Sequence, residues 1–193
     1  LVMLGMIVTL MTKSGGSQAY GKWAKKKMKS SKQSLFSTFV LGVVIFVDDY
    51  FNCLTVGSVM REITDEFKVS RAMLAYIIDS TAAPICIIAP ISSWAAAVSG
   101  YTSGDGFQLF LNTIPFNLYA LLTIVMVCYV IKSEFLVGKM RKHELAAKEG
   151  DIHFGDDSYQ TSEEISYNKN GKMIDLILPV IVLIFSCIVG MIY

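Results

Sequence analysis

Oxygen-bearing side chains interrupt two apolar stretches of this 193-residue sequence. The first interruption lies in "FVDDYFN", between the uncharged strings "LFSTFVLGVVIFV" and "CLTVGSVM". The second lies in the next apolar stretch, "AMLAYIIDSTAAPICIIAPISSWAAAV". The side chains concerned are Asp48, Asp49, Asn52, Asp79, Ser80 and Thr81.

These side chains predict a site for a hard cation or a proton. Each aspartate costs about 2.5–3.5 kcal/mol at the centre of a membrane helix, and no lysine or arginine lies in the apolar stretches to offset that cost. Carboxylate, amide and hydroxyl oxygens suit Na⁺, whereas thiols or imidazoles would favour transition metals. Both histidines, His143 and His153, lie in a polar segment. We therefore expect Asp48, Asp49 and Asp79 to be Na⁺ ligands.

Proton coupling has a direct physical basis at such a site. A buried carboxylate takes up a proton more readily, particularly beside a like charge. Na⁺ and H⁺ would then compete for the same oxygens, which gives exchange without a covalent step or a bound cofactor. A simpler interpretation is that Asp48 caps a helix at a turn, and a cap and a ligand are compatible.

Composition points to an integral membrane protein. Hydrophobic residues make up 53% of the chain, charged residues 17%, and the mean hydropathy is +0.52. A soluble domain has about 25% charged residues. The four cysteines are far apart in apolar segments, so we expect small buried side chains without a metal or redox role. The stretch "TKSGGSQAYG" lacks the ending of a phosphate-binding loop.

Charge distribution predicts the topology. All seventeen basic residues fall in three polar segments, with seven in 12–34, three in 61–71 and seven in 132–172, and none in 99–106. Basic loops stay cytoplasmic. The three segments share a side only if residues 35–60 enter the membrane and return. The sequence therefore predicts a re-entrant hairpin with "DDYFN" at its tip.

The remaining segments complete an all-α polytopic bundle. Residues 72–98 are expected to form a broken transmembrane helix, with the break near "DSTAAP" because Pro84 clashes with the carbonyl of Ser80. The other segments are the end of a transmembrane helix at 1–11, a basic cytoplasmic loop at 12–34, a connector at 61–71, an external loop at 99–106, a transmembrane helix at 107–131, a partly disordered cytoplasmic loop at 132–172 and a transmembrane helix at 173–193. The basic stretch in 12–34 is expected to act as a topology signal rather than as a specific lipid site.

The strings "FVDDYFNCLTVGSVMREITD" and "VSRAMLAYIIDSTAAPICIIAPISSW" resemble the NhaC-type sodium/proton antiporters of the wider ion-transporter superfamily. The resemblance covers about residues 13–98, and Glu62 stands where the family pattern has proline. It implies two inverted repeats, each with a re-entrant hairpin and a broken helix. The matching motif positions are Asp48, Asp49, Asn52, Asp79, Ser80 and Thr81.

The expected function is Na⁺/H⁺ antiport in the cell membrane, without enzymatic activity. The expected partners are the lipid bilayer, Na⁺ and H⁺, and the rest of the protein's own chain, with no nucleic acid; homo-oligomers are left open. Two alternatives stay open: Na⁺- or H⁺-coupled exchange of organic anions or amino acids, and a non-transporting product. The absence of an initiator methionine and the short apolar start predict an internal fragment of a longer protein.

Overall fold

The computed structural model describes residues 2–101, 104–152, 154, 168 and 170–192. Every regular element in these ranges is a helix, which confirms the all-α prediction. The helices are α1 (Val2–Lys13), α2 (Gly16–Lys27), α3 (Ser31–Val44), α4 (Asp49–Glu66), α5 (Arg71–Ile88), α6 (Ser93–Ser99), α7 (Gly106–Thr113), η1 (Ile114–Phe116), α8 (Leu118–Ser133), α9 (Lys139–Glu149) and α10 (Ile174–Ile192).

Polar side chains fix where many of these helices begin. Six of them accept a backbone N–H from the first turn, which satisfies a donor that the helix itself leaves open. These capping residues are Ser30, Asp48, Ser70, Ser92, Asp105 and Asn117. The chain therefore sets its helix boundaries with short local hydrogen bonds, including inside the apolar stretches.

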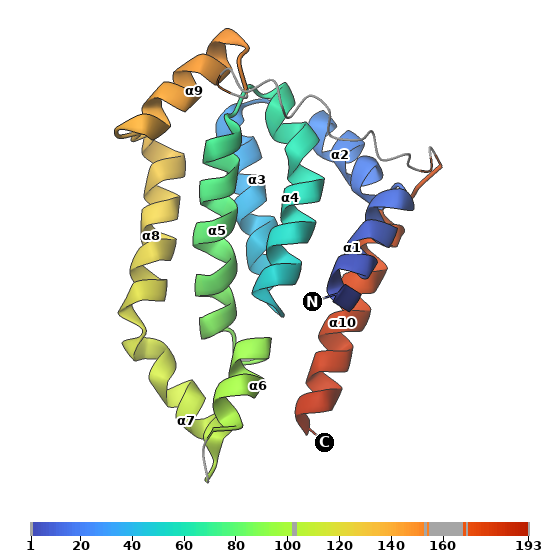
Figure 1. Ribbon diagram of the computed structural model, residues 1–193, viewed down its shortest axis with the longest axis vertical. Coiled ribbons are helices and arrows are strands. Elements are labelled where there is room, and N and C mark those ends of the chain that lie inside the picture. Colours follow the sequence, from blue (N-terminus) through green and yellow to red (C-terminus); the bar gives the residue numbers. More distant parts are fainter. Residues whose placement is uncertain (1, 102–103, 153, 155–167, 169, 193) are drawn as a thin grey trace.

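Helices α3 and α4 form a hairpin at the centre of the molecule (Figure 1). The chain descends through α3, turns at residues 45–48 and returns through α4, and α5 packs against both arms. The turn lies well short of the far end that α6 and α7 reach (Figure 1). A hairpin was predicted for residues 35–60, and the two helices extend from Ser31 to Glu66; its re-entry into a membrane stays a prediction.

Two groups of buried side chains hold the hairpin in place. One joins the second arm, α4, to α1, α2 and α10, and its members include Met11, Ala24, Phe51, Met60 and Leu176. The other joins the first arm to α5 and α8, and its members include Leu35, Met73, Ile77, Val127 and Val130. Each arm of the hairpin is thus packed against a different neighbour.

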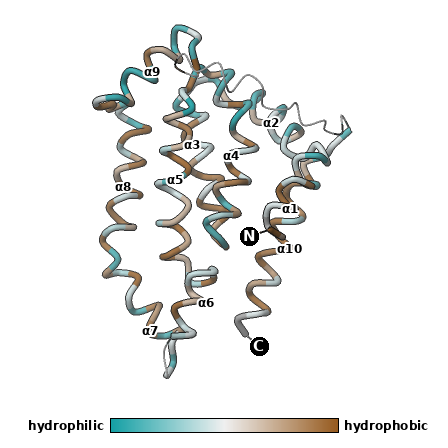
Figure 2. Tube along the Cα trace, in the orientation of Figure 1, coloured by the Kyte–Doolittle hydropathy of each residue, from teal (hydrophilic) through white to brown (hydrophobic). Residues whose placement is uncertain are grey.

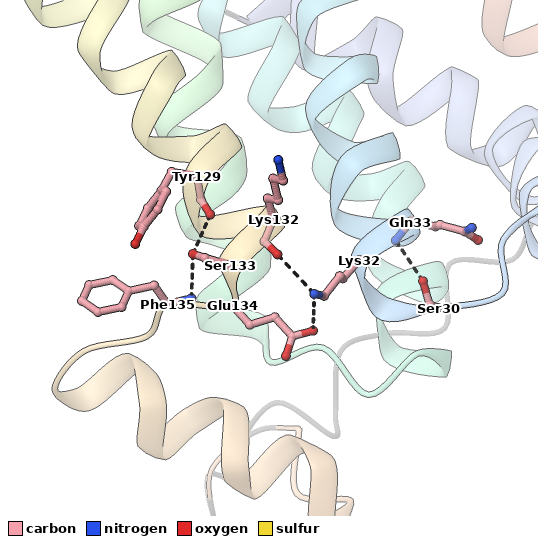
Figure 3. A network of polar contacts seen from close by, with 8 residues as sticks. All are labelled: Ser30, Lys32, Gln33, Tyr129, Lys132, Ser133, Glu134 and Phe135. Carbon is pink, nitrogen blue, oxygen red and sulfur yellow. Dashed lines mark hydrogen bonds and ion pairs between the residues drawn. The ribbon is translucent and has the colours of Figure 1, made fainter.

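The described parts of the three basic segments lie at one end of the molecule, the arrangement favoured by the charge count (Figure 2). Lys25 of α2 forms an ion pair with Glu66 at the end of α4. Lys32 of α3 reaches the end of α8, where its Nζ lies 3.2 Å from the carbonyl oxygen of Lys132 and 3.4 Å from Oε1 of Glu134 (Figure 3). These contacts join segments that are far apart in the sequence.

The position of the helix break corrects the sequence-based prediction. Helix α5 continues through "DSTAAP" and Pro84, and it ends only at Ile88. The break occupies residues 89–92, before α6. Pro90 explains this position, because a proline disfavours the helical conformation of the residue before it, and Ala89 is extended with ψ of 125°. Residues 72–98 are therefore interrupted as expected, but the interruption lies after Ile88 and not near "DSTAAP".

Three other expectations need correction. Residues 107–131 do not form one straight helix, because α7–η1 and α8 meet at 49° around Pro115, which cannot donate a backbone hydrogen bond. The expected loop at 12–34 contains α2, and the expected loop at 132–172 contains α9. Both helices gain stability from packing against the bundle rather than from an apolar sequence. The partial disorder predicted for residues 132–172 stays a prediction, and residues 153, 155–167 and 169 of this segment lie outside the described residues.

Among the described residues, one helix is long and apolar enough to cross a membrane, namely Arg71–Ile88. The bent pair formed by Gly106–Phe116 and Leu118–Ser133 would add a second crossing if it counts as one span. The apolar part of α10, Ile174–Gly190, is a shorter apolar helix. Length and composition alone therefore give weak support to a multi-pass protein.

Candidate functional site

The two helix breaks meet in space. The backbone N–H of Ser93, at the start of α6, donates to the carbonyl oxygen of Val47, in the turn between α3 and α4, at 2.8 Å. Val47 is buried, with 3% of its surface exposed. This hydrogen bond joins the hairpin turn directly to the break between α5 and α6. We call this region the break junction, formed by residues 45–48 and 89–93.

Asn52 holds the hairpin turn closed. Its Nδ2 donates to the carbonyl oxygens of Gly42 at 2.7 Å and Ile45 at 2.8 Å. Gly42 lies in the last turn of α3 and Ile45 directly follows the helix, where the end of a helix leaves carbonyl acceptors without partners. Asn52 is fully buried, and an amide with two N–H groups is suited to pairing with two carbonyls. This predicted site residue therefore has a clear structural role.

Thr81 lies against the same turn of α3. A Cβ added to Gly42 would come within 2.9 Å of Thr81 Cγ2 and 3.6 Å of Asn52 Oδ1. Glycine therefore permits close contact between α3 and α5 at this point. The Thr81 hydroxyl donates to the carbonyl of Ile77 at 2.6 Å, within its own helix. The structure thus brings Asn52 and Thr81 together on either side of Gly42.

Asp48 and Asp49 begin α4 at the junction. Asp48 Oδ1 accepts the backbone N–H of Phe51 at 2.9 Å, so the capping interpretation of Asp48 is correct. Asp49 is half-buried in the first helical turn. Negative charge is stabilised at this end of a helix, where the peptide dipoles leave partial positive charge. The lower, N-terminal end of α4 is correspondingly hydrophilic (Figure 2).

Asp79 lies on a different part of α5 from Thr81. Thr81 is buried, Ser80 is half-buried and Asp79 is exposed. Asp48 and Asp49 begin α4, whereas Asp79 lies at an exposed position of α5. Among the described residues, no three His, Cys, Asp or Glu side chains are grouped to hold a metal ion.

Two buried oxygens next to the junction have no hydrogen-bond partner among the described residues. They are Asn52 Oδ1 and Thr55 Oγ1, and the two residues are 0% and 1% exposed. Positions 49, 52 and 55 recur at intervals of three, so they lie near one another along α4. An unpaired buried acceptor costs about 1–3 kcal/mol, which makes an ion or water at this position energetically favourable.

Sequence reasoning missed Ser92, which connects the two half-helices at the second break. This residue is 0% exposed. Its hydroxyl is 2.7 Å from the carbonyl oxygen of Cys86 and 3.1 Å from that of Ala89, and it accepts the N–H of Ala95 at 3.2 Å. A serine placed directly before a short alanine-rich run and after Pro90 is the signal that could have identified it.

Comparison with known proteins agrees with these features. The family model described as "Na+/H+ antiporter family" matches residues 74–193, which is more than half of the chain. This chain therefore belongs to the Na⁺/H⁺ antiporter family, and the membership implies a membrane protein. Most of helix α5, including Asp79, Ser80 and Thr81, lies in the matched range, whereas Asp48, Asp49 and Asn52 precede it.

A relative supports the similarity along the whole chain. An uncharacterised protein of Haemophilus influenzae is 38% identical over 204 aligned residues, which include 100% of this chain and 38% of that protein. The chain thus spans less than half the length of this curated relative. No solved structure matches the chain.

Proposed function

We propose that the protein containing this chain is a secondary active transporter that exchanges Na⁺ for H⁺ across the cell membrane, and that it is not an enzyme. The observation that carries this proposal is the hydrogen bond between Val47 and Ser93, which joins two interrupted helices next to buried, unpartnered oxygens. Paired helix breaks that bind Na⁺ or H⁺ are typical of secondary transporters. The family match supports the same activity.

The proposed cation site uses oxygens of different kinds rather than three carboxylates alone. Asn52 Oδ1 is buried and unpartnered near Thr81, and Asp49 lies one turn earlier on the same helix. Na⁺ would bind among these oxygens, with Asp48 at the hairpin turn and with Ser80 and Thr81 on the middle part of α5. Asp79 would take part when a further segment covers its exposed side. Protonation of the carboxylates would release the cation.

The NhaC-type subfamily is part of the proposal. It is supported by the string "FVDDYFNCLTVGSVMREITD", which contains the hairpin turn and the first half of the site. A second repeat, located elsewhere in the protein's own chain, would cover the exposed face of α5. The length of the Haemophilus influenzae relative is consistent with such a partner.

The test is proton flux driven by a Na⁺ gradient in vesicles that contain the full-length protein. Asp49→Asn and Asp79→Asn remove one charge each and preserve side-chain size. We expect each to reduce flux by at least about tenfold, since a charged ligand contributes about 1.5–3 kcal/mol. Asp105→Asn is the matched control, because Asp105 caps α7 on an exposed surface away from the break junction.

Equal flux in both site variants and the control would refute the carboxylate mechanism. Exchange of organic anions or amino acids is tested separately by uptake of radiolabelled solutes under the same Na⁺ gradient. Na⁺-driven solute uptake without proton antiport would replace the proposed function with that alternative.

A further inference from the structure

Helix α2 has two chemically different faces. Its buried face consists of the small residues Gly16, Ser17, Gly21 and Ala24. This face lies against α4 and α10, and a Cβ added to Gly16 would come within 2.7 Å of the backbone nitrogen of Leu176. The opposite side of the helix is exposed and basic, with Lys22 and Lys26 one turn apart.

Most of the basic charge around α2 is not neutralised within the described part of the molecule. Lys25 pairs with Glu66, whereas Lys22, Lys26, Lys27 and Lys29 have no ion pair among the described residues. The first acidic residue of the whole sequence is Asp48, so no acid lies near these lysines along the chain. The four lysines therefore present uncompensated positive charge to their surroundings.

An aromatic side chain lies among these lysines. Trp23 is 43% exposed, and the Nζ of Lys27 lies 5.2 Å from the centre of its ring. Tryptophan favours the boundary between headgroups and acyl chains, because its ring is apolar while its N–H needs a polar partner. Trp23 is thus suited to the depth at which lysines meet lipid phosphates.

We propose that the exposed face of α2, formed by Lys22, Trp23, Lys26 and Lys27, is together with Lys29 just beyond the helix a binding surface for anionic phospholipid headgroups. Clusters of four or more basic residues on a helix next to a membrane segment attract anionic lipids. The surface lies at the same end of the molecule as the other basic segments (Figure 2), where the headgroups of one leaflet would meet it. The packing of α2 against α4 would then connect the lipid surface to the second arm of the hairpin.

The test measures binding of fluorescent phosphatidylglycerol to the full-length protein in neutral detergent, with fluorescent phosphatidylcholine as the neutral comparison. The variant is K22Q/K26Q/K27Q/K29Q, which removes four charges from exposed positions. We expect it to weaken phosphatidylglycerol binding by about tenfold or more and to leave phosphatidylcholine binding unchanged. The lysine-to-arginine version of the same four positions retains charge and should retain binding.

The matched control removes four charges from α9 at the same end of the molecule, through K139Q/R141Q/K142Q/K148Q. It should change binding by less than about twofold, because α9 also carries two acidic residues, Glu144 and Glu149. An equal loss in the α2 and α9 variants would overturn the proposal in favour of a general charge effect. Displacement of the lipid by soluble glycerol phosphate would also overturn it, since the ligand would then be a free phosphate.

A partner within the same chain is the remaining competitor for these lysines. Residues 156–164 contain four acids in the sequence. Neutralising them with D156N/D157N/E163Q/E164Q should leave phosphatidylglycerol binding unchanged if lipid occupies the surface. Binding that appears only in this variant would show that the acidic segment occupies it instead, and would overturn the proposal.

Discussion

The carbonyl oxygen of Val47 accepts the backbone N–H of Ser93 at 2.8 Å, and this hydrogen bond joins two helix breaks that are separated by more than forty residues. A break in an apolar helix exposes backbone groups that lipid cannot satisfy. Here the carbonyl of one break is satisfied by the N–H of the other. The two interruptions thus stabilise each other, and neither would be as favourable alone.

The first prediction tests this proximity by cross-linking. Cysteines at positions 47 and 93, in a variant without native cysteines, should form a disulfide in membranes, because the hydrogen bond places the two backbones within disulfide range. The pair of positions 47 and 99 is the control, since Ser99 lies at the other end of α6. Equal cross-linking of both pairs would contradict the junction.

Ser92→Ala is expected to destabilise the protein. The substitution removes the cap of α6 and the contacts with two carbonyls at the end of α5. A lost cap costs about 0.5–2 kcal/mol, and the buried groups left without partners raise the cost further. The free energy of unfolding in mixed micelles measures the effect. Ser133→Ala, at an exposed helix end, should cost far less.

Gly42→Ala should lower the free energy of unfolding, whereas Gly57→Ala on the other arm of the hairpin should not. A methyl group at position 42 would meet Thr81 at 2.9 Å and force α3 away from α5. Overpacking of this kind costs about 1–3 kcal/mol. At Gly57 the nearest atom is Ile78 Cδ1 at 3.8 Å, so Gly57→Ala should be neutral or stabilising. Equal unfolding free energies would contradict the close contact.

Glu144→Ala should weaken the attachment of α9 to the N-terminal end of α5. The buried carboxylate accepts the backbone N–H of Ser70 at 3.1 Å, and Ser70 in turn caps α5. Removing the acceptor leaves a buried N–H without a partner, at about 1–3 kcal/mol. Hydrogen exchange should therefore accelerate at the start of α5. Glu149→Ala, at an exposed position of α9, should leave exchange at that site unchanged.

Much of the architecture could be predicted from local signals. The charge count favoured a hairpin at residues 35–60, and the structure has two antiparallel helices there because each arm has its own apolar neighbours. The helix cap at Asp48, one interpretation that the sequence offered, also occurs in the structure. Local hydrogen bonding and polar content determine these features, so a single sequence contains the information.

The position of the break between α5 and α6 could not be predicted from such local signals. Pro84 and Pro90 both predict interruption, and the sequence alone does not indicate which helix turn can tolerate a missing donor. In the structure Ala89 takes an extended conformation, and the hydroxyl of Ser92 contacts the carbonyl oxygens of Cys86 and Ala89. That arrangement depends on contacts with the hairpin turn, which are formed only in the folded chain.

The candidate site was predicted in its residue types but not in its geometry. Asn52 was expected as a ligand, and its amide nitrogen turned out to hold the hairpin turn closed through Gly42 and Ile45. The amide oxygen of Asn52 and the hydroxyl oxygen of Thr55 are the buried atoms that stay available to a ligand. The direction of Asp79 also depends on the rotation of α5, which the neighbouring helices determine.

The hairpin of α3 and α4 starts and finishes at the same end of the molecule. In a membrane it would add no net passage between the two compartments, and so it would leave unchanged the orientation of every helix that follows. An ancestral chain could therefore have acquired or lost residues 31–66 without inverting its remaining spans.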